Sequence, residues 1–249
     1  MNTRDLKERL DGLAGRKGVF VRNLVSGEEW TWQPDCEVTA ASVIKLPIMV
    51  EFFRQAECGM LDETETYRLR EADKMEGSGV LFSLREGCTF SLHDLMVLMV
   101  IVSDNTATNI LIDKLGMENV NRTLAGLGLS RTRLRRKLFD EAASRAGIQN
   151  TITAGDMGRL LTLLYEGKAV SEAASWRMLK ILADQQFNGK IPFFLDLCVS
   201  HKTGEDEGIS HDVGIVWREE PLVLCFVGEQ VDVPAFERWM QDAAGQLCE

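Results

Sequence analysis

The chain has 249 residues, of which 45% are hydrophobic and 27% charged, so it is long enough to bury one large core or two smaller lobes. Its formal net charge of -10, from 38 acidic and 28 basic residues, argues against nucleic acid as a partner, because phosphate-backbone binding needs clustered lysine and arginine. No apolar stretch reaches transmembrane length. The longest candidate, residues 95–102, suits a buried helix.

The N-terminal residues 1–10 alternate charge with leucine, which predicts an amphipathic helix rather than a secretory signal. We therefore expect a cytoplasmic protein, with export as the alternative if a leader has been removed. Apolar runs at 18–25 and 29–32, separated by a turn-like Ser-Gly-Glu, predict a β-hairpin. Trp30 and Trp32 alternate along its second strand, so we expect them to face a packed layer.

The middle of the chain, from about residue 42 to 185, carries apolar residues at helical spacing. Strands are expected to return afterwards, followed by one closing helix. The strands are predicted at 197–203, 213–217 and 222–227, and the helix at about 234–247.

These elements predict an α+β fold. One antiparallel sheet is built from N- and C-terminal strands with flanking helices, and an all-helical lobe is inserted into it. We expect a single domain, residues 1–249, with a cleft where the two lobes meet. The sheet lobe would comprise about 1–45 and 190–249, and the helical lobe about 46–189.

Six cysteines lie far apart in the sequence, with no CxxC pair and no histidine at ligand spacing. This pattern is typical of reduced structural thiols, and it predicts neither a zinc site nor another metal or cofactor.

Ser42 and Lys45 form a Ser-x-x-Lys pair. If a helix begins at Ser42, both side chains share one face and the lysine amine reaches the serine hydroxyl. A hydroxyl needs a neighbouring base to become a nucleophile, and a buried lysine beside other cations can lose its proton and act as that base. Pro47 fits this helix poorly, because it removes the donor for the Val43 carbonyl. In a chain of this length and average composition, roughly one Ser-x-x-Lys pair is expected by chance. The pair alone therefore fits a helix-capping serine and a surface lysine better than a catalytic site.

Two further motifs accompany this pair. Ser103-Asp104-Asn105 follows an apolar run and precedes a helix-start sequence, and Lys202-Thr203-Gly204 ends a predicted strand, where its lysine and threonine can line a cleft. Each tripeptide is expected by chance in only about a few per cent of such chains, so all three motifs together indicate a site.

In this order the motifs resemble those of class A β-lactamases and penicillin-binding proteins, the penicillin-recognising serine hydrolases, and the likeness covers nearly the whole chain. The resemblance implies a serine hydrolase in which Ser42 is acylated and Lys45 helps to deprotonate it. Ser103 would relay a proton to the leaving group, with Lys202 holding that region electropositive.

The same resemblance implies which residues bind the substrate. Asn105 would contact the substrate or the lysine of the first motif, and Thr203 would bind a substrate carboxylate. The oxyanion hole would consist of the backbone N–H groups of Ser42 and of Glu205, the residue just past Gly204.

The sequence departs from the family at the residue that removes the acyl group. Class A β-lactamases use a glutamate, in a Glu-x-x-Leu-Asn-Glu-Ala phrase, to direct water onto the acyl-enzyme. Aligning residues 139–142 with the end of that phrase places Arg136 at the position of this glutamate, and a cation cannot be a general base. Asp140 or Glu141 could substitute as the base if the loop folds differently.

A second departure follows Lys202-Thr203-Gly204, where three acidic residues, 205–207, stand beside a cleft that would receive a carboxylate. Like charges repel, so we expect the cleft to bind the anionic carboxylate of penicillins less well than its relatives do. The next strand carries His211 instead of an arginine, and we expect this histidine to be structural, with a substrate contact as the alternative.

The sequence therefore predicts a serine hydrolase that forms an acyl-enzyme on Ser42 but releases β-lactams slowly. Its substrate would be a small-molecule or peptide-like acyl donor: a β-lactam, an amide or an ester. One alternative is a competent class A β-lactamase with Asp140 or Glu141 as base, and another is a non-catalytic ligand-binding relative. We expect a monomer.

Overall fold

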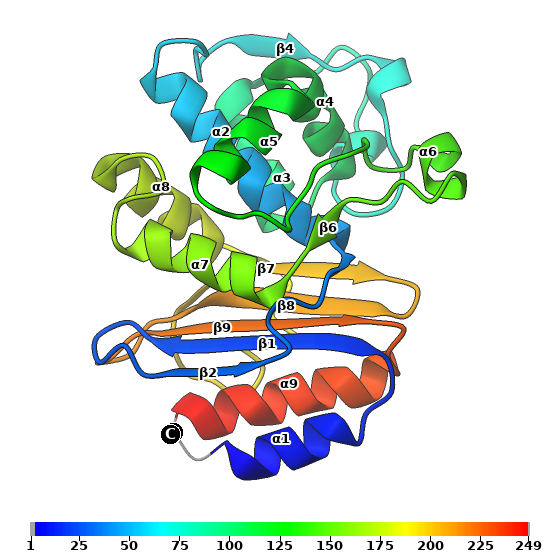
Figure 1. The fold of residues 1–249 in the computed structure, drawn as a ribbon. Helices are drawn as coiled ribbons and strands as arrows, with labels where there is room; N and C mark the ends of the chain where they lie inside the picture. The colour runs from blue at the N-terminus through cyan, green and yellow to red at the C-terminus, as the bar shows by residue number, and fades with distance from the viewer. Residues whose placement is uncertain (1–2, 249) are drawn as a thin grey trace.

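A five-stranded antiparallel sheet forms the centre of the fold in the computed structural model, which describes residues 3–248. The spatial order of the strands is β2-β1-β9-β8-β7, so strands from the two ends of the chain join in one sheet with no break in the hydrogen bonding (Figure 1). The first pair consists of β1 (Arg16–Asn23) and β2 (Glu29–Trp32), and the other three strands are β7 (Val199–Asp206), β8 (Ile209–Val216) and β9 (Leu222–Glu229).

Helices cover both faces of this sheet. On one side, α1 (Arg4–Asp11) and α9 (Val233–Cys248) lie side by side, and the Trp239 indole N–H donates to the Leu6 carbonyl over 3.0 Å (Figure 1). Trp30 and Trp32 are partly buried against this layer, as predicted. The other face packs against α7 (Ala154–Tyr165) and α8 (Glu172–Ala183).

The helical lobe continues from that second face, with α2 (Lys45–Glu57) running through its middle. Most of the side chains of α2 are buried, because α3, α4, α5 and α8 all pack around it. The other helices of this lobe are α3 (Leu92–Ile101), α4 (Asn105–Leu115), α5 (Met117–Gly126) and α6 (Glu141–Arg145), and two small sheets pair β3 (Val38–Thr39) with β6 (Thr151–Ile152) and β4 (Thr66–Arg68) with β5 (Thr89–Ser91).

The predicted architecture is confirmed: terminal strands build one antiparallel sheet, and the helical segment is inserted between them. The second strand has the predicted bounds, whereas the three C-terminal strands are longer than the apolar runs indicated. β7 continues to Asp206, so Lys202, Thr203 and Gly204 lie inside the strand and not at its end. Polar residues extend these strands because their backbone groups still pair in the ladder.

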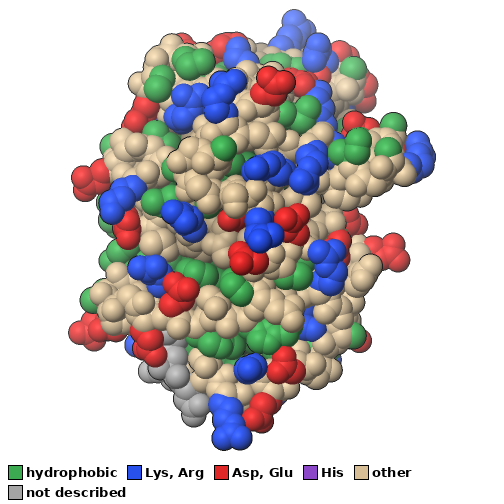
Figure 2. All heavy atoms as spheres, viewed as in Figure 1, with side chains coloured by type: hydrophobic (Ala, Val, Ile, Leu, Met, Phe, Trp, Pro, Cys, Tyr) green, Lys and Arg blue, Asp and Glu red, His purple; other side chains and the backbone are tan. Residues whose placement is uncertain are grey.

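The surface carries both kinds of charge. Acidic and basic side chains are interspersed over the face that Figure 2 shows. Within residues 3–248, no helix is long and apolar enough to cross a membrane.

Candidate active site

Ser42 lies in a short 3₁₀ helix, η1 (Ala41–Ile44), that links the sheet to the helical lobe. The sequence suggested an α-helix beginning at Ser42, but α2 begins at Lys45. The reason is local: Ala41 adopts a left-handed φ of 41°, and the following turn is tighter than an α-helix. Pro47 consequently falls in the first turn of α2, where backbone N–H groups have no partner within the helix, so it removes no helical hydrogen bond.

Lys45 brings the first two motifs together. Its Nζ lies 3.0 Å from Ser42 Oγ, 2.9 Å from Ser103 Oγ and 2.9 Å from Asn105 Oδ1, and it also donates to the Ser103 carbonyl over 2.7 Å. The side chain is fully buried. A neutral amine has two N–H bonds and one lone pair. It can therefore donate to the Ser103 carbonyl and to Asn105 Oδ1, and still accept a proton from the Ser42 hydroxyl.

Asp104 holds the second motif in place. Its Oδ1 accepts the Ala107 N–H over 2.8 Å and so caps α4, while Oδ2 accepts the N–H groups of Val80 and Leu81 over 2.7 and 2.8 Å. The loop that precedes Val80 must pass close to the Asp104 side chain. A Cβ on Gly79 would lie 2.3 Å from Asp104 Oδ2, so only glycine fits there.

Ser103 itself adopts a left-handed φ of 54°, and its hydroxyl lies between two lysines. That conformation costs a residue with a Cβ about 1–2 kcal/mol. We predict that Ser103→Ala and Ser103→Gly both slow the acylation of Ser42 by about 10²-fold, because both remove the hydroxyl. Ser103→Gly should nevertheless be more stable than Ser103→Ala by about 1 kcal/mol in urea unfolding. Equal stabilities would contradict a strained backbone at this position.

The third motif lies on β7, the edge strand of the sheet, where it contacts η1. A Cβ on Gly204 would lie 3.1 Å from Val43 Cγ2 and 3.3 Å from the Ala40 carbonyl, so the absent side chain lets the strand approach the serine. Lys202 Nζ lies 3.1 Å from Ser103 Oγ and 3.0 Å from the Thr203 carbonyl.

The two buried lysines have unusual acidity. Burial lowers the pKa of Lys45 well below its ordinary value, and the charge of Lys202 lowers it further, while Asp104 acts in the opposite direction. Burial also lowers the pKa of Lys202 to about 7, against the charge of Asp212, which raises it. Lys45 therefore gives up its proton more readily than an ordinary lysine, and Lys202 is partly protonated near pH 7.

This pair predicts a bell-shaped pH profile for the acylation of Ser42. The rate should rise with pH as Lys45 loses its proton, and fall as pH passes about 7 and Lys202 loses its own. Asp212→Asn removes a charge that raises the pKa of Lys202, so it should move the falling limb to lower pH by about one unit. The measurement is the second-order acylation rate against pH, with thermal unfolding of the variant as a folding control. A falling limb that does not move would exclude Lys202 as its origin.

The cleft beside Ser42 has a volume of ≈ 290 Å³ and is bounded on one side by the loop that carries Arg136. Arg136 lines this cleft, but its guanidinium bonds remain within the loop: Nε donates to the Ile148 carbonyl over 3.1 Å, and Nη2 to Gln149 Oε1 over 2.7 Å. The cleft is lined by Thr39, Ala41, Ser42, Gly77, Ser78, Asn105, Arg136, Leu138, Phe139, Asp140, Glu141, Ser144, Asn150, Glu205 and Asp206.

Asp140 and Glu141, the two alternative bases, also line the cleft, and each has a partner within the loop. Asp140 Oδ1 accepts the Ala143 N–H over 2.9 Å and caps α6, and Glu141 forms an exposed ion pair with Arg145 over 3.1 Å. Asn109 on α4 fixes the loop to the helical lobe through two hydrogen bonds with the Leu138 backbone.

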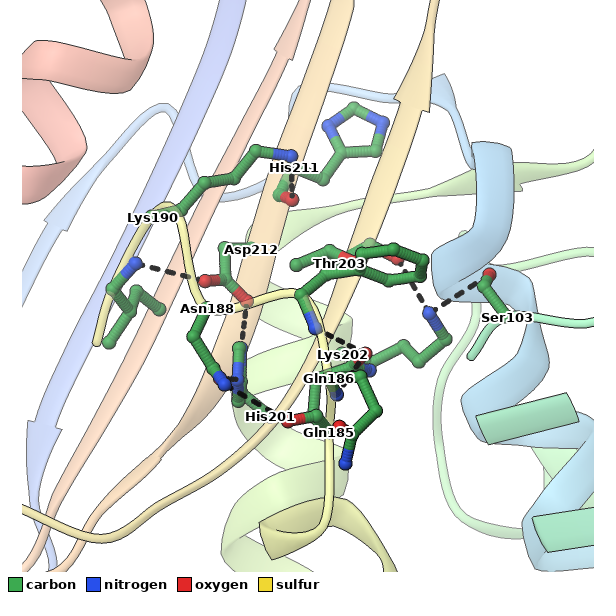
Figure 3. Close-up of polar contacts among 12 residues, drawn as sticks. Ser103, Gln185, Gln186, Asn188, Lys190, His201, Lys202, Thr203, His211 and Asp212 are labelled. Atoms are coloured by element: carbon green, nitrogen blue, oxygen red, sulfur yellow. Dashed lines mark hydrogen bonds and ion pairs between the residues drawn. The ribbon is translucent and has the colours of Figure 1, made fainter. Parts of the chain in front are cut away.

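Two histidines beside the third motif are buried structural residues. Gly228 N–H donates to His211 Nδ1 over 3.1 Å, so His211 Nε2 carries the proton and donates to the Thr39 carbonyl over 2.8 Å. Burial lowers the pKa of His211 to about 4, which agrees with a neutral ring. His201 lies one residue before Lys202 and pairs with the buried Asp212 over 2.8 Å (Figure 3). Across residues 3–248, no cluster of three or more His, Cys, Asp or Glu is arranged to hold a metal ion.

Sequence comparison matches residues 2–247 to the family described as the Beta-lactamase enzyme family. Similar curated proteins include the β-lactamases CARB-3 and PSE-4 of Pseudomonas aeruginosa, each 26% identical over 189 residues, or 75% of this chain. The match spans 65% of the length of those relatives. The β-lactamase regulatory protein BlaB of Streptomyces cacaoi is 27% identical over 168 residues, which cover 62% of this chain and 54% of that protein.

Solved structures share the fold along nearly the whole chain. A β-lactamase from Sphaerobacter thermophilus superimposes with a TM-score of 0.92 at 30% identity, covering 99% of this chain and 97% of that one. The structure of PBP-A superimposes with a TM-score of 0.89 at 25% identity, covering 98% and 93%. A mutant of PBP-A, solved as an acyl-enzyme complex with penicillin G, gives 0.86 at 26% identity, covering 98% and 92%. These superpositions confirm the predicted β-lactamase-like fold.

Proposed function

This chain belongs to the β-lactamase enzyme family, and on that basis we propose that it is a serine hydrolase that forms an acyl-enzyme on Ser42 and releases β-lactam acyl groups slowly. The observation that carries the proposal is the position of the buried Lys45 amine, 3.0 Å from Ser42 Oγ. A base at this distance is what a serine hydroxyl needs to become a nucleophile.

This geometry supports the following acylation step. Ser42 Oγ attacks the carbonyl carbon of the donor as its proton passes to the Lys45 amine. The backbone N–H groups of Ser42 and Glu205 would stabilise the negative charge that develops on the carbonyl oxygen. When the tetrahedral intermediate collapses, Ser103 gives its proton to the leaving group. The neighbouring Lys45 and Lys202 can reprotonate Ser103, because both lie within 3.1 Å of its Oγ.

Deacylation lacks the general base that class A β-lactamases use. A water molecule must lose a proton as it attacks the ester on Ser42, and the position that aligns with the glutamate of class A β-lactamases is occupied by Arg136. Its guanidinium stays protonated at any accessible pH and therefore cannot accept that proton. We infer that an acyl group derived from a β-lactam persists on the enzyme.

The test is to incubate the protein with benzylpenicillin and follow its intact mass over time. We expect an adduct that forms within minutes, persists for hours and maps to the peptide containing Ser42. Ser42→Ala is the matched control and should give no adduct. If folded protein forms no adduct with any β-lactam or activated ester, it is not an acyl-serine hydrolase, and failure of a fluorophosphonate to label Ser42 would favour a non-catalytic binding protein.

A second candidate function is a competent β-lactamase, which is supported by the presence of Asp140 and Glu141 in the lining of the cleft. One of these carboxylates would then leave its partner in the loop and activate the deacylating water. Steady-state hydrolysis of nitrocefin through many turnovers, abolished by Asp140→Asn or by Glu141→Gln, would establish this function. Release of less than one equivalent would exclude it.

A further inference from the structure

Lys190 is a buried cation close to the edge strand of the active site. It lies in the segment between α8 and β7, and its side chain is only 3% exposed. Its Nζ is 2.7 Å from Glu205 Oε1 and 3.6 Å from Glu237 Oε1 on α9, and it donates to the His211 carbonyl over 3.4 Å. Figure 3 shows Lys190 extending towards the His211 backbone, whereas Lys202 extends towards Ser103. One buried positive charge is therefore shared by two carboxylates.

Glu205 is the member of this group that reaches the active site. Its side chain is 64% exposed and lines the main cleft together with Ser42. It also lines a smaller adjoining hollow, whose walls include Ser42, Ser103 and Thr203. A donor bound to Ser42 with its leaving group towards Thr203 must pass beside this carboxylate.

The charge beside Thr203 is consequently unfavourable for an anion. The negative charge of Glu205 balances the positive charge of Lys190, and Glu237 adds a second negative charge. The three groups together therefore carry a formal charge of −1. Asp206, the next residue on β7, also places its carboxylate in the lining of the cleft. The repulsion from these carboxylates opposes the attraction that Lys202 would offer to an anion at this edge.

We propose that Glu205, by occupying Lys190, makes the cleft select acyl donors that are uncharged next to the leaving group. The favoured substrates are esters and amides without a carboxylate at that position, rather than free-acid penicillins or peptides that end in a free carboxylate. This inference rests on the proposed acylation of Ser42, and it specifies the class of acyl donor that reacts with Ser42.

The test compares benzylpenicillin with its methyl ester, in which a small uncharged group replaces the carboxylate; the Glu205 variant and the salt dependence then isolate the effect of charge. The acylation rate of Ser42 is measured by mass spectrometry at pH 6, where Lys202, with a pKa of about 7, keeps most of its proton. The wild-type protein should react faster with the methyl ester than with the acid by about tenfold, the order expected for two unit charges a few ångströms apart at a protein surface.

Glu205→Gln should lower this ratio of ester to acid by about fivefold, because it removes the repelling charge and leaves the charge of Lys190 balanced by Glu237 alone. The matched control is Glu207→Gln, which removes the same charge two residues further along the chain and should change the ratio by less than about twofold. A second measurement uses the wild-type protein alone: raising the salt concentration should speed the reaction of the acid and leave that of the ester unchanged.

Each outcome is decisive. Equal rates for acid and ester, or a ratio that Glu205→Gln and salt do not change, overturn the selectivity while leaving acylation of Ser42 intact. If Glu207→Gln lowers the ratio as much as Glu205→Gln does, the effect belongs to the general charge of the turn and not to the pair with Lys190. If neither compound forms an adduct, and no other β-lactam or activated ester does either, the proposed function itself has failed.

Discussion

Replacing Lys45 with arginine should slow the acylation of Ser42 by about 10³-fold, nearly as much as replacing it with methionine. Arginine keeps a positive charge and sufficient length to reach Ser42, but its guanidinium does not give up its proton in a protein. Lys45 contacts Ser42 Oγ, Ser103 Oγ and Asn105 Oδ1, so it can act either as a base or through its positive charge. Comparing the two variants separates these roles. The measurement is the rate of adduct formation with a β-lactam, followed by mass spectrometry.

Thermal unfolding of both Lys45 variants provides the control, because each replacement disturbs a fully buried hydrogen-bonding group. If both variants fold and arginine retains a rate within about tenfold of the wild type, Lys45 acts through its charge and not as a base. The proton of Ser42 would then need another acceptor.

Arg136→Glu should accelerate the loss of the acyl group from Ser42 by about 10²-fold, a modest value for a newly placed general base. The residue lines the cleft that contains Ser42, and its sequence position aligns with the deacylating glutamate of class A β-lactamases. The measurement is the decay of a preformed penicillin adduct after excess β-lactam is removed, together with steady-state turnover of nitrocefin.

Arg136→Gln is the matched control for this change. Both substitutions remove the guanidinium bonds to the Ile148 carbonyl and the Gln149 side chain, so both loosen the loop equally. Only glutamate adds a carboxylate. If the adduct decays equally fast in both variants, a more open loop and not a base accounts for the gain, and the assignment of slow deacylation to Arg136 is wrong.

Local pattern was sufficient to predict much of the fold. The strands are short runs of alternating or continuous apolar residues, and the helices have regular apolar spacing, so both follow from side-chain periodicity. The three motifs were also visible in the sequence, because Ser42, Ser103 and Lys202 each stand in a recognisable tripeptide or pair. The structure brings these three side chains together through Lys45 and Ser103, as a shared site requires.

The sequence could not predict the interactions that cross between elements. Lys190 and Asp212 stand in no motif, and the bonds of Asn109 to the Leu138 backbone depend on which loop lies beside α4. The sequence also did not predict the backbone conformation at two residues of the site. Ala41 and Ser103 both adopt left-handed φ values, and a residue type other than glycine gives no warning of this conformation.

The carboxylate of Asp104 has a consequence for the motion of the active site. It accepts three backbone N–H groups, those of Val80, Leu81 and Ala107, which belong to two segments that are far apart in the chain. Releasing any one of them leaves a nearly fully buried anion with fewer donors, which is costly, so the three hydrogen bonds support one another. The wall of the cleft at 75–81 and the first turn of α4 therefore behave as one mechanical unit, opening together or not at all.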